Sequence, residues 1–80
     1  MNFKGDVMGD SKVLKLLRDD LVGELNAISQ YQQHIDELSG EAKKVLEHNM
    51  NEEKEHVVEL IAVIRKLDAV QNEKFKKEGM

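Results

Sequence analysis

The sequence contains no cysteine, no proline and no tryptophan, and only five glycines. Without cysteine, the chain forms neither a disulfide framework nor a zinc site built on thiolates. One tyrosine and two phenylalanines are the only aromatic residues, while charged residues make up 35% of the chain. This composition, rich in helix formers, predicts an all-α protein.

Long apolar runs are also missing. No segment approaches the roughly 20 apolar residues of a membrane span, and the first residues do not resemble a secretory signal. The net charge of −4 argues against nucleic acid as a partner. The sequence therefore predicts one small cytoplasmic domain that binds neither nucleic acid nor membrane. At 80 residues, such a domain has too small a core to be very stable alone.

The chain is expected to begin with a short arm and a long helix. Residues 1–9 show no apolar periodicity, so we expect a flexible N-terminal arm. Asp10 or Ser11 carries a side-chain oxygen that can cap a helix. A first helix is then predicted over residues 10–38, within a helical domain that covers residues 10–78.

A turn and a second break follow. Ser39-Gly40 has turn chemistry, because glycine readily adopts the left-handed conformation that ends a helix. A second helix is predicted over residues 41–67, antiparallel to the first because the connection is short. Asp68 and Gln71 have the spacing of a capping box, which predicts a short third helix over residues 69–77. One helix running straight through this point is the alternative.

Apolar residues recur at steps of three and four along both long helices, as in a packed helical seam. In the first helix the seam runs Leu14, Leu17, Leu21, Glu24, Ile28, Tyr31, Ile35 and Leu38; in the second it runs Leu46, Met50, Glu53, Val57, Leu60, Ile64 and Leu67. Glu24 and Glu53 each interrupt a seam near its middle, and His56 lies one turn after Glu53. The seams contain no lysine or arginine to neutralise these carboxylates, so a metal ion is the expected partner.

The apolar faces are too wide for two helices to cover. Val13, Val22 and Leu25 widen the first face, and Val45, Val58, Ile61 and Val63 widen the second. Two hairpins packed as a four-helix bundle would bury them. Di-iron bundles take a Glu from two helices and a Glu-x-x-His from the other two. One chain holds half of that set, and a two-fold axis would supply the rest.

Other polar residues have competing interpretations. Tyr31 follows Glu24 by two turns, so it is either a weak ligand or hydrogen-bond donor there, or an ordinary core aromatic. Glu24 and Glu53 are alternatively a buried polar pair that fixes helix register. His34 lies off the seam, and His48 lies in an acidic patch that is most simply a solvated surface.

At these residues the chain resembles the encapsulated ferritins, over about residues 10–78. The most specific stretches are residues 24–31 (ELNAISQY) and 46–56 (LEHNMNEEKEH). The resemblance implies a ferroxidase site formed between two subunits, with Glu24, Tyr31, Glu53 and His56 at the matching positions. It also implies a ring of five dimers, carried inside an encapsulin shell where the oxidised iron is stored.

The sequence departs from the better-known members of that family. Gly23 and Asn26 stand where those members carry further glutamates on an access route, and Gln30 stands where tryptophan is common. A shell-targeting tail is not visible near Glu78-Gly79-Met80. Either that tail is missing from this sequence or this member does not enter a shell.

The expected function is oxidation of Fe(II) to Fe(III) by dioxygen at a di-iron site between two subunits, for iron storage or detoxification. Glu53 and its symmetry mate would bridge the two ions, and Glu24 and His56 of each chain would together complete the coordination of one ion. The alternatives are a non-enzymatic helical dimer that binds a protein partner and a bundle that holds Zn²⁺ or Mn²⁺ structurally.

Overall fold

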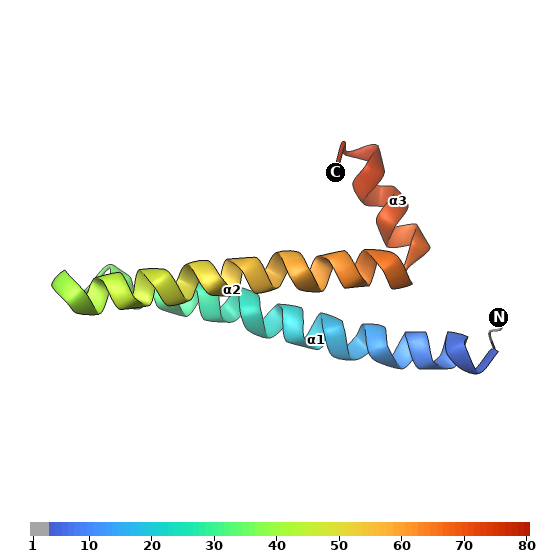
Figure 1. Ribbon diagram of the computed structural model, residues 1–80, viewed down its shortest axis with the longest axis horizontal. Coiled ribbons are helices and arrows are strands. Elements are labelled where there is room, and N and C mark those ends of the chain that lie inside the picture. The colour runs from blue at the N-terminus through green and yellow to red at the C-terminus, as the bar shows by residue number, and fades with distance from the viewer. Residues whose placement is uncertain (1–3) are drawn as a thin grey trace.

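The computed structural model describes the backbone of residues 4–80 and the side chains from Asp10 onward. It contains helices α1 (Lys4–Ile35), α2 (Gly40–Leu67) and α3 (Ala69–Lys77), with no strand among the described residues. The two long helices lie side by side and antiparallel, and α3 leaves the end of α2 at a wide angle (Figure 1). The predicted fold class, an all-α hairpin with a short C-terminal helix, is confirmed.

The first helix begins earlier than the sequence predicted. Because α1 starts at Lys4, residues 4–9 are helical rather than a loose arm, and neither Asp10 nor Ser11 caps the helix. Residues 1–3 of the predicted arm lie outside the described residues. This extension includes Gly5 and Gly9. Once a helix has nucleated, each further residue adds a backbone hydrogen bond, and this gain offsets the roughly 1 kcal/mol that each glycine costs relative to alanine.

The same helix also ends earlier, at Ile35 instead of residue 38. The Leu38 amide donates to the Ile35 carbonyl at 3.1 Å, a tight bond that closes the turn. The Asp36 carboxylate accepts a hydrogen bond from the Gln32 side chain at 3.0 Å. Gly40 has the predicted left-handed conformation, with φ +64°, but it opens α2 instead of closing α1.

The predicted break between α2 and α3 is present at Asp68. Its carboxylate accepts a hydrogen bond from the Gln71 amide at 3.0 Å, which is the first half of the capping box. The second half of the capping box, a bond from the Asp68 amide to the Gln71 side chain, is replaced. The Asp68 amide donates instead to the Ile64 carbonyl at 2.9 Å. A satisfied cap therefore begins α3 where the sequence placed it.

Side-chain contacts hold α3 against the hairpin. The Arg18 guanidinium on α1 donates to the Asp68 carboxylate at 2.7 Å. Arg65 on α2 donates to the Asn72 side-chain oxygen at 2.7 Å and lies 4.8 Å from the centre of the Phe75 ring. These contacts join all three helices at one end of the molecule.

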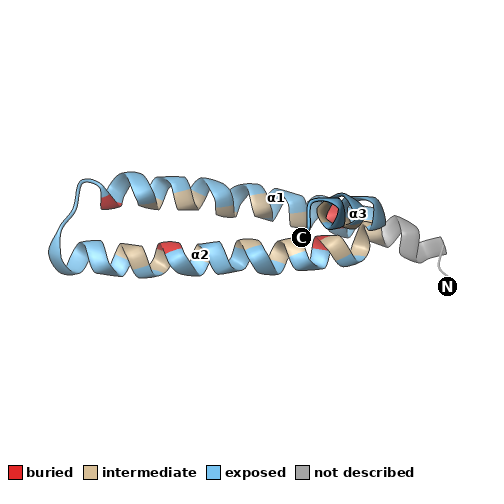
Figure 2. Ribbon diagram, turned by 90° about the horizontal axis from the view of Figure 1, so that it is seen from above, coloured by how far each residue is buried: buried red, intermediate tan, exposed pale blue. Residues whose placement is uncertain are grey.

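The molecule is flat and leaves most of its apolar side chains uncovered. Its extents are 54 × 27 × 14 Å, so its thinnest dimension is little more than one helix diameter. Four hydrophobic side chains are buried among those described, namely Leu14, Ile35, Met50 and Ile64. Figure 2 shows how little of each ribbon is buried. No described helix combines the length and the apolar character needed to span a bilayer.

Candidate metal centre

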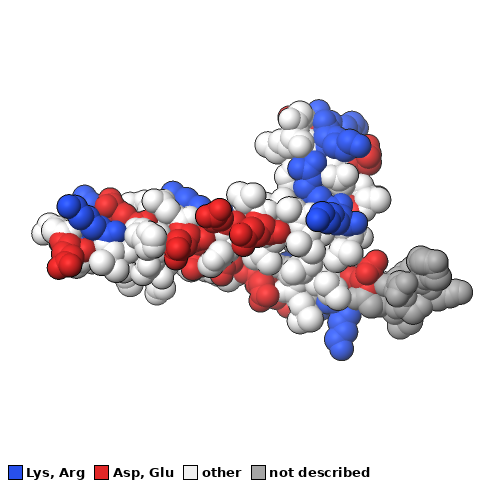
Figure 3. All heavy atoms as spheres, in the orientation of Figure 1, with Lys and Arg blue, Asp and Glu red and all other residues white. Residues whose placement is uncertain are grey.

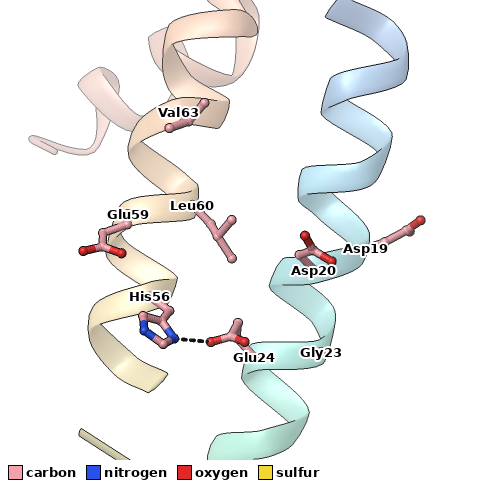
Figure 4. A pocket seen from close by; sticks show the side chains of 8 residues that line it. All are labelled: Asp19, Asp20, Gly23, Glu24, His56, Glu59, Leu60 and Val63. Atoms are coloured by element: carbon pink, nitrogen blue, oxygen red, sulfur yellow. Dashed lines mark hydrogen bonds and ion pairs between the residues drawn. The ribbon is translucent and has the colours of Figure 1, made fainter. Parts of the chain in front are cut away.

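Three predicted ligands meet near the middle of the hairpin. His56 Nδ1 on α2 lies 2.9 Å from Glu24 Oε2 on α1 and 3.8 Å from Glu53 Oε1 on its own helix. One potential ligand atom from each residue lies within 4.8 Å of the others. Figure 4 shows His56 and Glu24 pointing toward each other across the space between α1 and α2. Glu24 and Glu53 are nearly equidistant from the turn along the chain, and this places them at the same height.

The local helix geometry explains this meeting. Each glutamate occupies a seam position and therefore points toward the neighbouring helix, where it is partly shielded from water. The side chains of Glu53 and Glu24 are 20% and 25% exposed, whereas that of His56 is 50% exposed. Neither carboxylate forms an ion pair with a lysine or arginine among the described residues. The His56 imidazole is the basic group that they face, and the lack of a lysine or arginine partner agrees with the sequence pattern.

The three groups perturb one another's proton affinity. A hydrogen bond with Glu53 lowers the pKa of Glu24, and the same bond raises the pKa of Glu53. The pKa of His56 is raised, chiefly by its hydrogen bond with Glu24. A proton is therefore held more readily by Glu53 than by Glu24, which faces the imidazole.

Tyr31, the fourth predicted site residue, and the histidines His34 and His48 lie outside this cluster. Tyr31 is half-buried on α1, two turns after Glu24, and the two form no hydrogen bond in the described part of the chain. His34 is exposed and lines an open pocket near the turn with Glu37, Leu38 and Leu46. His48 is also exposed, with its Nε2 atom 3.5 Å from a Glu52 carboxylate oxygen. A single hairpin therefore unites three of the four predicted site residues.

An acidic groove adjoins the cluster and adds residues that the sequence interpretation missed. Its volume is about 480 Å³, and its lining consists of Asp19, Asp20, Gly23, Glu24, His56, Glu59, Leu60 and Val63. Asp20 lies four residues before Glu24, and Glu59 lies three after His56, so each lies one helical turn from a residue of the cluster. Figure 3 shows acidic side chains gathered over the middle of α2 and basic ones over α3.

The donor atoms suit a divalent transition metal. Two carboxylate oxygens and one imidazole nitrogen are ligands that iron, zinc and manganese accept, and no thiolate is available to select a softer ion. Three protein ligands leave coordination positions open, which is typical of sites where chemistry takes place. The residues present therefore fit a divalent metal ion such as iron, and Glu24, Glu53 and His56 are the residues that could hold it.

Comparison with known proteins places the chain in a family. It matches the EncFtn-like family over residues 7–78. It is 38% identical over 65 residues to the "Encapsulin nanocompartment cargo protein EncC" of Myxococcus xanthus (strain DK1622), a match that covers 80% of this chain and 50% of that relative. The chain thus spans about half the length of that curated relative, and no solved structure gives a significant match. Because the family match covers nearly the whole sequence, the chain belongs to the EncFtn-like family.

Proposed function

We propose that this protein is a ferroxidase, in which two chains combine their ligands into one di-iron site and oxidise Fe(II) with dioxygen. The convergence of Glu24, Glu53 and His56 within 4.8 Å, in a member of this family, supports the proposal most directly. One chain contributes a Glu from α1 and a Glu-x-x-His from α2. A di-iron four-helix bundle takes two of each, and a second copy of the chain supplies the other half.

The apolar surface of the hairpin supports pairing. Large hydrophobic side chains remain exposed along both long helices, including Leu16 at 55%, Leu25 at 49%, Val45 at 52% and Val63 at 41%. Burying apolar area releases about 25 cal/mol per Å², so a second hairpin packed on this surface stabilises both copies. The resulting unit would be a ferritin-like four-helix bundle. A ring of five such dimers is the larger assembly that the family resemblance implies.

Each residue has a distinct role in the proposed site. Glu53 from each chain would bridge the two ferrous substrate ions, while Glu24 and His56 of the same chain would together hold one of them. Tyr31 lies on the same stripe of α1 and hydrogen-bonds to, or weakly binds, the assembled centre. The chain holds the ions at bridging distance, and each Fe(II) passes one electron to dioxygen.

The cargo name of the relative suggests where this reaction takes place. That protein is named as encapsulin nanocompartment cargo. We propose by analogy that this chain associates with an encapsulin shell and that the oxidised iron is stored inside it. Its location would then be the nanocompartment interior.

Aerobic mixing with Fe(II) tests the ferroxidase activity. Ferric absorbance should rise faster with the wild type than in buffer, and Glu53→Ala should return the rate to that of buffer. Glu52→Ala is the matched control, because Glu52 is the preceding residue on α2 with a 60% exposed side chain and lies outside the three-residue cluster. We expect this variant to keep the wild-type rate.

Two other results would favour the alternative functions. A wild type that oxidises iron only at the buffer rate, without bound metal after purification, would indicate a helical interaction module. Bound zinc or manganese without oxygen consumption would instead indicate a structural metal bundle.

A further inference from the structure

A basic pocket lies in the corner where α2 meets α3 (Figure 1), away from the candidate metal centre. Its volume is about 310 Å³, and Ala62, Arg65 and Lys66 from α2 line it together with Asn72 from α3. Lys66 follows His56 by ten residues, which is about 15 Å along the helix. We propose that this pocket binds a phosphate group, either as free inorganic phosphate or as the phosphate of a small monoester. The inference does not depend on the ferroxidase proposal.

The Arg65 side chain is held in place by two residues of α3. Its Nε atom donates to the Asn72 side-chain oxygen at 2.7 Å, and its guanidinium carbon lies 4.8 Å from the centre of the Phe75 ring. Within the described part of the chain, this hydrogen bond engages one of the five N–H donors that a guanidinium has. The donors of the two terminal nitrogens remain, in a plane that the Phe75 ring helps to fix. Such a planar fork matches two oxygens of one phosphate.

Asn72 and Lys66 bring further donors to the same pocket. Because the Asn72 side-chain oxygen accepts from Arg65, the N–H groups of its side-chain nitrogen are available as donors. The Lys66 ammonium is exposed and belongs to the residue next to Arg65 in the pocket lining. Three side chains therefore offer hydrogen-bond donors, and two of them are positively charged. This combination suits a phosphate, which carries a charge of about −1.5 to −2 at pH 7 and has only strong acceptor oxygens to satisfy.

The acidic side chains nearest along the chain are paired with other cations. Asp68 accepts from Arg18 at 2.7 Å, and the Glu73 carboxylate lies 3.5 Å from the Lys76 ammonium. Among the described residues, no carboxylate lies within ion-pair distance of either cation of the pocket. A half-buried guanidinium without a carboxylate partner favours an anion taken up from solution. Further basic side chains gather over α3 (Figure 3), and their charge attracts anions to this end of the molecule.

Isothermal titration calorimetry of the full chain with inorganic phosphate, at constant ionic strength and without added metal, tests the proposal. We expect saturable binding of one phosphate per chain. Asn72→Asp keeps an oxygen that accepts from Arg65 but places a carboxylate in the pocket, so it should weaken phosphate binding by at least about tenfold. Lys66→Gln removes one charged donor and should weaken binding about fivefold. Lys44→Gln is the matched control, because it changes the net charge equally at an exposed position of α2 outside the pocket, and it should bind like the wild type.

The comparison of Lys66→Gln with Lys44→Gln decides the question even if Asn72→Asp disturbs α3. The proposal is wrong if the wild type shows no saturable phosphate binding, or if the two lysine variants lose affinity equally, which would indicate general attraction of anions. A parallel titration with glycerol 3-phosphate identifies the source of the phosphate group. Tighter binding than that of inorganic phosphate would indicate a monoester, and equal or weaker binding would indicate the free ion. None of these results affects the ferroxidase proposal, which is tested by iron oxidation.

Discussion

The Glu53 carboxyl and the His56 imidazole each bind a proton more tightly than the free side chain does, and a cation competes with those protons. The pKa of Glu53 is raised above its ordinary 4.5, first by the hydrogen bond with Glu24 and further by desolvation and by the charges of Glu24 and Glu52. The pKa of His56 is raised above its ordinary 6.5 by Glu24, with added contributions from the charges of Glu53 and Glu59. Cation binding requires the deprotonated forms of both residues, so binding and proton release are linked.

Zn²⁺ affinity should therefore rise with pH. Below the raised pKa of His56 the imidazole is protonated and competes with the cation; above it, the ring nitrogen is free. We expect affinity to increase by about tenfold or more between pH 6 and pH 8, a window that contains the titration of histidine. Isothermal titration calorimetry in two buffers of different ionisation enthalpy would count the released protons. Affinity that stays constant across this window would contradict the prediction.

The sequence predicted this cluster well because helical spacing is rigid. Glu24, Glu53 and His56 could be placed together from seam periodicity and distance from the turn alone. The difference in pKa between Glu24 and Glu53 could not be predicted from the sequence, because it depends on side-chain rotamers and hydrogen bonds rather than on spacing. Asp20 and Glu59 were missed for a different reason: charged residues on a helix surface are common, and only the groove distinguishes these two.

Among the elements, the corner at Asp68 was the most predictable and the ends of α1 the least. The Asp68–Gln71 cap involves residues three apart and so depends on local sequence alone. The start of α1 depends on the balance between helix propagation and glycine propensity, which differ by small free energies. Its end depends on how the chain closes the turn before Gly40, where tertiary packing decides between nearly equal choices.

Substitution at Asp68 should separate its two contacts. Asp68→Ala removes both the cap of α3 and the ion pair with Arg18, so we expect the free energy of unfolding to fall by about 1–2 kcal/mol. Asp68→Asn keeps a capping oxygen and should lose less than about 1 kcal/mol, because the Arg18 side chain is 51% exposed. Chemical denaturation measures both changes in the free energy of unfolding.

Amide hydrogen exchange measures how far the loss of stability is confined to α3. In Asp68→Ala, the amides of α3 should exchange faster, while those near the middle of α2 keep their protection. Equal stability losses in the two variants would show that the ion pair, rather than the cap, holds the corner.

As a whole, the molecule has two apolar faces on opposite sides of a single layer. Val63 lines the acidic groove and so lies on the face that carries Glu24 and His56. Val58 lies about 140° around α2 from Glu53, on the other side. The two valines are 41% and 67% exposed. Pairing through the metal face would cover only the first, which leaves the second for contacts between dimers in a larger ring.

Matched lysine substitutions test whether one apolar face forms the dimer and the other joins dimers into a larger assembly. In V63K the new ammonium lies one turn from Glu59, which favours it in the free hairpin, but pairing would bury it at a cost of about 3 kcal/mol. The dimer dissociation constant should therefore rise about 100-fold in saturating Zn²⁺. V58K should still form dimers but no larger species. Sedimentation velocity distinguishes the three masses, and circular dichroism checks that both variants remain helical. If V63K assembles like the wild type while V58K is monomeric, the pairing face is the one opposite the metal ligands, and a shared di-iron centre between two chains is ruled out.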